Sequence, residues 1–369
     1  MTTSDASAPP PGAGERPDAL AERLFGATIG TLELFGVHLG VQLGLYRWLA
    51  RSGAMTAGEL ATVAGIDERY GREWLEQQAV AGILAVDDQA APVAERRFSL
   101  PEGHAAVLAD PEHPAHAAPF AAMVVGIAGA LPAVVDAYRS GTGVPYVRYG
   151  IDFCDGQAAI NRPAFTHELA DWLAAAPDLH ARLAADPPAR VADLGCGQGW
   201  STLALAAAYP KAAVDGIDLD QASIDAANRH AAGHPAAGRV SFSVRDAGQL
   251  APSGPYDLVC IFEALHDMAA PVEVLAAAGS ALAPGGAVLV ADERVAGTFT
   301  APGDEVERMM YGWSISHCLP ASRESQPSAA LGTVLRESTV GDLAAAARFS
   351  SVEVLPVDNL FFRFYVLRA

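Results

Sequence analysis

From residue 189 onward the sequence alternates between short apolar segments and longer segments with helical periodicity. Five of the apolar segments read as strands that are each followed by a helical stretch: RVADLG, AVDGIDL, VSFSVRD, YDLVCIF and AVLVADE. Parallel strands need a long crossover, usually a helix, so the alternation predicts an α/β fold with a doubly wound, mostly parallel sheet. The last two segments, SVEVLPV and LFFRFYVL, predict an antiparallel hairpin at the sheet edge.

The first predicted strand ends in a glycine-rich turn, VADLGCGQGW. Gly195, Gly197 and Gly199 allow the backbone to approach a nucleotide-like ligand without interference from a Cβ atom. The dinucleotide fingerprint G-x-G-x-x-G is not met, because Trp200 stands where its last glycine should pack a helix closely against the sheet. This departure disfavours a nicotinamide-dependent oxidoreductase, an alternative that tighter binding of NADH than of S-adenosylhomocysteine would restore.

Two acidic residues follow at the ends of the next strands. Asp218 ends the second strand at the distance where a carboxylate accepts hydrogen bonds from ribose hydroxyls. Asp246 ends the third strand, where its carboxylate can accept from an adenine amino group while the amide of Ala247 donates to a ring nitrogen. Open α/β sheets bind ligands at the carboxyl ends of their strands, which favours this interpretation over the alternative that both aspartates only cap helices.

These motifs resemble, in order and spacing, those of class I S-adenosylmethionine (SAM)-dependent methyltransferases: DLGCGQG, GIDLD, RDA, YDLVCIFEALHD and LAPGGAVLVADE. The resemblance covers roughly residues 189–369 and implies a Rossmann-like domain with a seven-stranded sheet, in which LAPGG is the turn before the fifth strand. It implies that the glycine turn packs against the methionine portion of SAM. The cofactor-binding residues that it implies are Asp193, Gly195, Gly197, Asp218, Leu219, Asp246, Ala247 and Phe262.

The chain before this domain divides into three predicted segments. Residues 1–18 are expected to form a disordered tail. Residues 19–110 carry the pattern of a winged helix: helices rich in Leu, Phe and Gly, a capping-box pair at Thr56 and Glu59, a helix over 67–81, and two short strands. Residues 111–188, mostly helical but broken by a loop at 140–156, are expected to link the domains and cap the active site.

A winged helix either binds DNA or serves as a dimerisation module. The would-be recognition helix carries Arg69 and Arg72 but also three glutamates, and the whole chain has a net charge of -19, so it offers phosphates no positive face. The layout is similar to that of plant O-methyltransferases, which implies a homodimer formed through the N-terminal domain and no nucleic-acid partner. A SAM-sensing transcriptional regulator is the alternative of another class.

A glycine stripe in the first helices supports close helix packing. Gly36, Gly40 and Gly44 recur every fourth residue and line one face, where another helix can approach. Because glycine costs about 1 kcal/mol in a helix interior, the stripe predicts a tight helix pair or a dimer seam.

The segment FEALHD, residues 262–267, carries the candidate catalytic groups at the end of the fourth strand. Methyl transfer from a sulfonium is an in-line displacement, so a base is needed only when the acceptor must lose a proton. His266 has the side chain that suits this role near neutral pH, and Glu263 can orient it or act on the acceptor itself. The alternative is that both residues only contact the cofactor or cap the next helix.

Tyr149, Trp313 and His317 are the predicted acceptor-binding residues, and they favour a small aromatic or indole-type secondary metabolite methylated on carbon, oxygen or nitrogen. No metal ligand is assigned. The alternative is iron-assisted C-methylation of an α-keto acid, for which His266, His317 and Asp267 would supply the two-histidine, one-carboxylate set.

The sequence also predicts where the protein works. Four cysteines show no paired spacing, and the N-terminus lacks the basic and apolar regions of a secretory signal, so a cytoplasmic location is expected. The apolar stretch at 117–135 is interrupted by two prolines and is expected to be a buried or interface helix rather than a membrane span.

Overall fold

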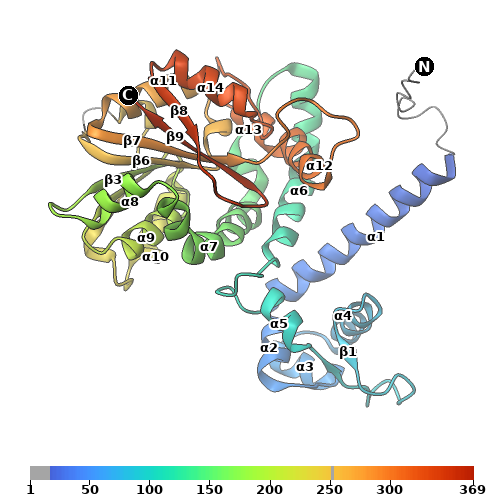
Figure 1. The fold of residues 1–369 in the computed structure, drawn as a ribbon. Helices are drawn as coiled ribbons and strands as arrows, with labels where there is room; N and C mark the ends of the chain where they lie inside the picture. Colours follow the sequence, from blue (N-terminus) through green and yellow to red (C-terminus); the bar gives the residue numbers. More distant parts are fainter. Residues whose placement is uncertain (1–16, 251–252) are drawn as a thin grey trace, which may run out of the picture. The chain divides into compact units, whose positions relative to one another are not determined.

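A computed structural model describes residues 17–250 and 253–369 (Figure 1). The chain divides into two compact units, one comprising residues up to Asp110 together with Phe299–Asp304, and the other comprising Pro111–Thr298 and Glu305–Ala369. Residues 111–188 therefore belong to the same unit as the sheet. The predicted tail, residues 1–18, lies outside the described residues except for Pro17 and Asp18, which begin the first helix.

The N-terminal unit is a winged helix. Its elements are α1 (Pro17–Gln42), α2 (Leu45–Ser52), α3 (Ala57–Ala64), α4 (Glu68–Val80), β1 (Ala85–Val86), β2 (Phe98–Ser99) and α5 (Glu102–Leu108). The predicted capping box starts α3, because Thr56 accepts from the amide of Glu59 while the Glu59 carboxylate accepts from the amide of Thr56. β1 and β2 pair antiparallel and form the predicted wing.

The glycine stripe packs α1 against α4 of the same chain. The Trp74 indole N–H donates to the carbonyl of Gly36 at 2.8 Å, and a Cβ on Gly40 would lie 2.5 Å from the rings of Trp74 and Tyr46. Gly44, with φ of 68°, lies in the turn after α1 and is the N-cap residue of α2. The stripe thus makes a tight helix pair within one chain, while apolar side chains nearer the start of α1, such as Leu24, Phe25 and Leu32, are exposed.

The second unit is built on a seven-stranded sheet in the order β5-β4-β3-β6-β7-β9-β8. Strands β3 (Arg190–Leu194), β4 (Ala213–Asp218), β5 (Val240–Val244), β6 (Tyr256–Phe262) and β7 (Leu282–Glu293) are parallel. β8 (Ser351–Val354) and β9 (Phe362–Arg368) form the predicted antiparallel hairpin, which places β8 at the edge. The Rossmann-like, mostly parallel sheet predicted from the motifs is confirmed.

Two boundaries differ from the sequence prediction. β7 already begins at Leu282, so LAPGG belongs to the strand instead of preceding it, and the pairing shifts register opposite Tyr256–Leu258. A bulge lets a turn-like glycine pair, including Gly285 with φ of 80°, remain in the ladder. The loop expected at 140–156 ends early, because the helix after it begins at Gly150.

Helices cover both faces of the sheet, as Figure 1 shows. One face packs against α7 (Gly150–Ala174), α8 (Pro177–Ala184) and α9 (Trp200–Ala208) through side chains such as Leu173 and Leu205. The other packs against α11 (Pro271–Ser280) and α14 (Glu337–Ala346) through Leu275 and Val340. Because each fully buried Leu or Val contributes about 1.5–3 kcal/mol, this double core holds the central strand ends in place.

The remaining elements stand at the carboxyl end of the sheet or beside it. They are α6 (Pro119–Ser140), α10 (Gln221–Ala231), α12 (Glu305–Trp313), the π-helix Ser314–Cys318, α13 (Leu319–Ser322) and the 3-10 turns Tyr146–Tyr149, Ala237–Arg239, Ala247–Gln249 and Leu265–Asp267. By length and composition α1 and α6 each pass the test for a membrane-crossing helix, with mean hydropathy of 1.4 and 1.9. Core helices of globular domains pass the same test, and α6 packs Met123 and Val134 into a buried cluster with α7.

Candidate active site

The glycine turn after β3 has the backbone that the sequence anticipates. Gly195 and Gly197 have φ of 72° and 51°, in the left-handed region that favours glycine. A Cβ on Gly195 would lie only 2.6 Å from the Cβ of Ala264, so the turn is in close contact with the segment that follows β6. Tertiary packing therefore brings the predicted cofactor turn next to FEALHD.

Asp193 and Asp218 hold this turn from two sides. The buried Asp193 carboxylate accepts from the hydroxyls of Ser201 and Thr202, each at 2.6 Å, while its Oδ1 has no hydrogen-bond partner. Burial raises the pKa of Asp193 to about 6 despite these two hydrogen bonds. Asp218 accepts from the amide of Gly197 at 2.8 Å, and burial raises its pKa as well.

The other predicted cofactor residues lie along the same strand ends. Asp246 is exposed and accepts from the amide of Gly248 at 2.8 Å, so it does cap the short 3-10 turn that begins at Ala247. Leu219 is 71% exposed beyond the end of β4. Phe262 is buried at the end of β6 and packs against the Phe165 ring at 5.5 Å.

A cavity of about 470 Å³ adjoins the ends of β6 and β7. Its apolar wall comes from α6, α7 and α12 and from residues 360–362. Its polar wall includes three charged or imidazole groups from the strand ends, Glu263, His266 and Glu293, and also Asn161 from α7. This size and mixture of surfaces are typical of small-molecule sites.

Glu263 stands at the end of β6 in a strained backbone conformation, with φ of 49°. Left-handed backbone at a residue other than glycine costs about 1–3 kcal/mol and is concentrated at functional sites. Its carboxylate contacts the amide nitrogen of Asn161. Burial raises the pKa of Glu263 to about 7, although the nearby His266 and Asn161 act in the opposite direction.

His266 is held between two carboxylates. Its Nδ1 lies 2.9 Å from Asp292 Oδ1, and its Nε2 lies 3.5 Å from Asp267 Oδ1. Burial opposes a charge on the ring, yet Asp292 and Asp267 together raise the pKa of His266 well above its usual value. The imidazole is therefore a cation near neutral pH, which makes Glu263 the better-tuned proton acceptor.

Sequence reasoning missed several groups that complete this site. Asp292 and Glu293 end the fifth strand, AVLVADE, so the strand-end rule that found Asp218 was available for them too. Asn161 lies on α7, 102 residues before Glu263, and no local pattern marks it. Burial raises the pKa of Glu293 well above its usual value, and Glu263 adds to that effect.

The three predicted acceptor-binding residues have different positions. Trp313 lines the cavity and stacks on Phe120, with ring centroids 6.4 Å apart. His317 also lines it, from a π-helix, a distortion that is often found at functional sites. Tyr149 is buried behind the wall, where its ring contacts His317 and its hydroxyl donates to the carbonyl of Ser316 at 3.1 Å.

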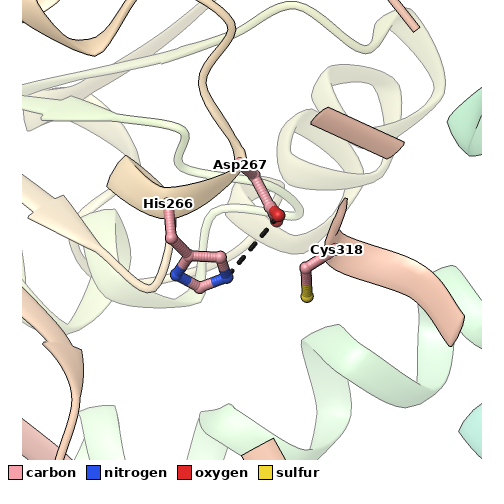
Figure 2. Close-up of side chains that lie close together, drawn as sticks. All are labelled: His266, Asp267 and Cys318. Carbon is pink, nitrogen blue, oxygen red and sulfur yellow. Dashed lines mark ion pairs between the residues drawn. The ribbon is translucent and has the colours of Figure 1, made fainter. Parts of the chain in front are cut away.

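Three side chains next to the cavity form a group that can hold a cation. His266, Asp267 and Cys318 each offer a ligand atom, and these atoms lie within 4.8 Å of one another (Figure 2). The Asp292 carboxylate on His266 Nδ1 leaves Nε2 facing the group, as carboxylates do behind metal-bound histidines. His317 is not part of this group, so the two-histidine, one-carboxylate set of non-haem iron is not formed.

Two family models match the chain. Residues 185–328 match the family described as a methyltransferase domain, and residues 31–110 match the Rv2258c-like winged helix-turn-helix domain. Among curated proteins, the trans-aconitate 2-methyltransferase of Streptomyces avermitilis is 34% identical over 139 residues, which is 38% of this chain and 49% of that protein. The same enzyme of Methylobacterium nodulans is 37% identical over 134 residues, 33% of this chain and 50% of that protein. The chain thus spans about half the length of these relatives.

Solved structures resemble nearly the whole chain. Human N-acetylserotonin methyltransferase, in complex with SAM, has a TM-score of 0.69 at 16% identity and covers 97% of this chain and 99% of its own. The mitomycin 7-O-methyltransferase MmcR has a TM-score of 0.65 at 19% identity, with coverage of 95% and 98%. At these identities the likeness shows the fold.

Proposed function

We propose that this chain transfers the methyl group of SAM to a small-molecule acceptor. Its methyltransferase domain follows an Rv2258c-like winged helix-turn-helix domain in the sequence. One observation carries the proposal. The glycine turn at Gly195, the Asp218 carboxylate and the cavity walled by Glu263 and His266 all lie at the carboxyl ends of adjacent strands. That arrangement allows one ligand to span the turn and present a methyl group to the cavity.

In this proposal each strand end contacts a different part of the cofactor. Gly195 and Gly197 back the methionine portion, and Asp218, whose oxygens each retain a free lone pair beside their backbone amide, accepts from the ribose hydroxyls. Asp246 and Ala247 receive the adenine, and Leu219 and Phe262 complete the proposed cofactor contacts. Asp193 supports the glycine turn indirectly, because its carboxylate accepts a hydrogen bond from Ser201 of α9.

Glu263 is the proposed proton acceptor for an acceptor atom that loses a proton during transfer. Its raised pKa, about 7, matches what a general base needs near neutral pH. His266, cationic between Asp292 and Asp267, lowers the pKa of Glu263 from a distance and keeps part of it ionised. The cavity supplies the other requirement of an in-line displacement, alignment of the acceptor away from water.

The pH dependence of transfer tests these roles. We expect kcat to rise through pH 7 as Glu263 ionises, and Glu263→Gln to lose this rise and lower kcat roughly 10²–10⁴-fold. His266→Asn removes a positive charge, so the rise should move to higher pH. Glu273→Gln, an exposed change on α11, is the matched control. Equal binding of S-adenosylhomocysteine by all variants would separate chemistry from folding, and an unchanged profile in Glu263→Gln would remove that residue from the mechanism.

A small aromatic or indole-type compound is the proposed acceptor, since Trp313 and Phe120 make an aromatic wall. The first experiment is incubation with SAM carrying carbon-13 in its methyl group and a panel of indoles and phenols, read by NMR. The chemical shift of a new methyl signal reports whether carbon, oxygen or nitrogen has been methylated. Tight SAM binding with no transfer to any compound would favour a sensor, and a gel shift at low salt would then test DNA binding.

Metal-assisted transfer is a second candidate, favoured by the group of His266, Asp267 and Cys318. Imidazole, carboxylate and thiolate together suit Zn²⁺ better than the iron of α-keto acid C-methylation. A bound cation would polarise an acceptor oxygen, and the three side chains would hold it at the cavity wall. Elemental analysis of the purified protein, with Cys318→Ala as the matched variant, tests this. A stoichiometric metal that the variant loses would support it, and full transfer activity of metal-free protein after chelation would reject it.

The proposed enzyme is a cytoplasmic homodimer joined through its N-terminal unit. The exposed apolar side chains of α1 support a partner for that helix, and the free thiols of Cys154, Cys196, Cys260 and Cys318 fit a reducing compartment. On α4, Arg69 forms an ion pair with Glu73, which weakens it as a phosphate ligand. Light scattering tests the dimer, and Leu24→Glu with Leu32→Glu should yield monomers.

A further inference from the structure

The polar lining of the cavity is acidic. Among the described residues that line it, four carry carboxyl groups, and none is a lysine or arginine. Glu293 is buried and Glu263 half-buried, whereas Glu168 and Asp358 are exposed and Asp358 pairs with Arg294 at 3.2 Å. A site that binds a carboxylate normally supplies arginine or lysine, because a buried anion needs a cation or several hydrogen-bond donors. The chemistry of this lining therefore disfavours acidic acceptors.

Glu293 is the group that most needs a ligand. Its side chain is 7% exposed, it lines the cavity, and its Oε2 has no hydrogen-bond partner. A buried carboxyl oxygen without a donor costs free energy, and most such atoms in folded proteins are paired. An N–H or ammonium group entering the cavity would supply the donor that Glu293 lacks.

His266, one of the three histidines that line the cavity, does not offer a free positive charge to an anion. The charge on His266 is already matched by Asp292 at 2.9 Å and Asp267 at 3.5 Å. The His317 ring is buried, and its Nδ1 lies 3.4 Å from the Cys318 sulfur. The buried Nε2 of His317 also lacks a hydrogen-bond partner and stays available to the ligand.

The apolar part of the lining suits a flat, apolar body. Phe120 and Trp313 stack with their planes 13° apart, and Met123, Ile160 and Met310 continue the surface. Aromatic and methionine side chains bind rings by dispersion and adapt to their shape. The lining thus combines an aromatic surface with carboxyl groups.

We propose that the acceptor is an amine carried on an aromatic body, with its nitrogen donating to Glu293 and Glu263 and its ring against Phe120 and Trp313. This rests on the proposed function, whose acceptor class it narrows. The proposed acceptor, an amine, differs from the acid named in the trans-aconitate 2-methyltransferases. The chain matches those enzymes over about half their length.

Two matched ligand series test the proposal. Tryptamine, tryptophol and indole-3-propionate share one ring and differ only in an ammonium, a hydroxyl or a carboxylate at the end of the side chain. Phenethylamine, 2-phenylethanol and 3-phenylpropanoate repeat the comparison with a smaller ring, and trans-aconitate is added to both. Binding is measured by calorimetry, with and without saturating S-adenosylhomocysteine, for the unaltered protein, Glu293→Gln and the exposed control Glu273→Gln.

We expect the amine to bind tightest and the carboxylate weakest in each series. Glu293→Gln should weaken amine binding roughly 10- to 100-fold, the range of a hydrogen bond to a charged group, while Glu273→Gln leaves it unchanged. Carboxylate binding as tight as amine binding, an amine preference that survives Glu293→Gln, or no binding of any amine would overturn the inference. S-Adenosylhomocysteine that fails to bind would instead contradict the proposed function, and the order within each ligand series would still judge the acceptor class.

Discussion

Replacing Asp193 with asparagine tests whether this carboxylate is kept at a cost to stability. The Asp193 side chain is 1% exposed and accepts two hydroxyl hydrogen bonds, yet burial raises its pKa from 3.8 to about 6. A carboxyl whose pKa is higher in the folded state binds its proton more tightly there. Its contribution to the free energy of unfolding is therefore greatest at low pH and is lost as the pH rises through about 6.

The size of the effect follows from the shift. The pKa of Asp193 rises from 3.8, its usual value, to about 6 in the folded protein. Since one pKa unit equals about 1.4 kcal/mol, the folded state loses about 3 kcal/mol of stability once the carboxyl is ionised in both states. Part of this loss has already occurred at pH 5, where the unfolded chain is ionised and the folded carboxyl is not. Between pH 5 and pH 8 the remaining loss is about 1.4 kcal/mol. Asparagine has the same shape and keeps one hydrogen-bond acceptor, but it does not ionise. The Asp193→Asn variant should therefore not lose stability between pH 5 and pH 8 through this residue.

Urea unfolding at both pH values, without cofactor, measures the effect. The gain in stability of Asp193→Asn over the unaltered protein should be about 1.4 kcal/mol larger at pH 8 than at pH 5. Asp342→Asn removes an exposed carboxylate from α14 and controls for the loss of a negative charge. An identical difference at both pH values would refute the reasoning. A simultaneous loss of SAM affinity would indicate that the charge is retained for the ligand.

Three further changes test the packing around the site. Gly195→Ala places a Cβ 2.6 Å from the Cβ of Ala264, in a backbone with φ of 72°. The variant should lose about 1–3 kcal/mol of stability and bind S-adenosylhomocysteine more weakly. Normal affinity in calorimetry would contradict the close approach. Trp74→Phe removes the hydrogen bond to the Gly36 carbonyl and should cost about 1 kcal/mol of stability. Hydrogen exchange of the amides in α1 should become faster. Unchanged exchange would argue that α4 does not hold α1 in place. Arg336→Met removes the guanidinium that lies 2.8 Å from the buried Glu307 carboxylate and should cost about 3 kcal/mol in thermal unfolding. The double change with Glu307→Met should recover most of this loss, and no recovery would reject the pair as the cause.

Several parts of the structure could be predicted from short stretches of sequence. The capping box at Thr56 and Glu59 depends on residues three apart, and the structure contains it as expected. The strand–helix alternation predicted the parallel sheet, because apolar runs report which segments are buried on both faces. Glu263 and His266 were found by the same logic, since parallel strands present their carboxyl ends at one edge.

Other parts depended on contacts between distant residues. Asn161 and Glu263 meet although they are 102 residues apart, and nothing around Asn161 distinguishes it from other polar positions on a long helix. Tyr149 was expected in the acceptor pocket, but a Gly/Pro-rich loop does not reveal which of its aromatic side chains points inward. The predicted loop ended instead in α7, which buries that ring behind the wall.

The chain's sequence by itself determined its fold class, its winged helix and the strand ends at which chemistry can occur, because burial and turn formation leave local patterns. The tertiary structure decided which charged groups share one water-poor space. That sharing raises the pKa of His266 well above its usual value, brings the pKa of Glu263 to about 7 and leaves Oε2 of Glu293 without a hydrogen-bond partner. Those properties come from desolvation and from charges on separate strands, and neither the spacing nor the identity of residues along the chain records such distances.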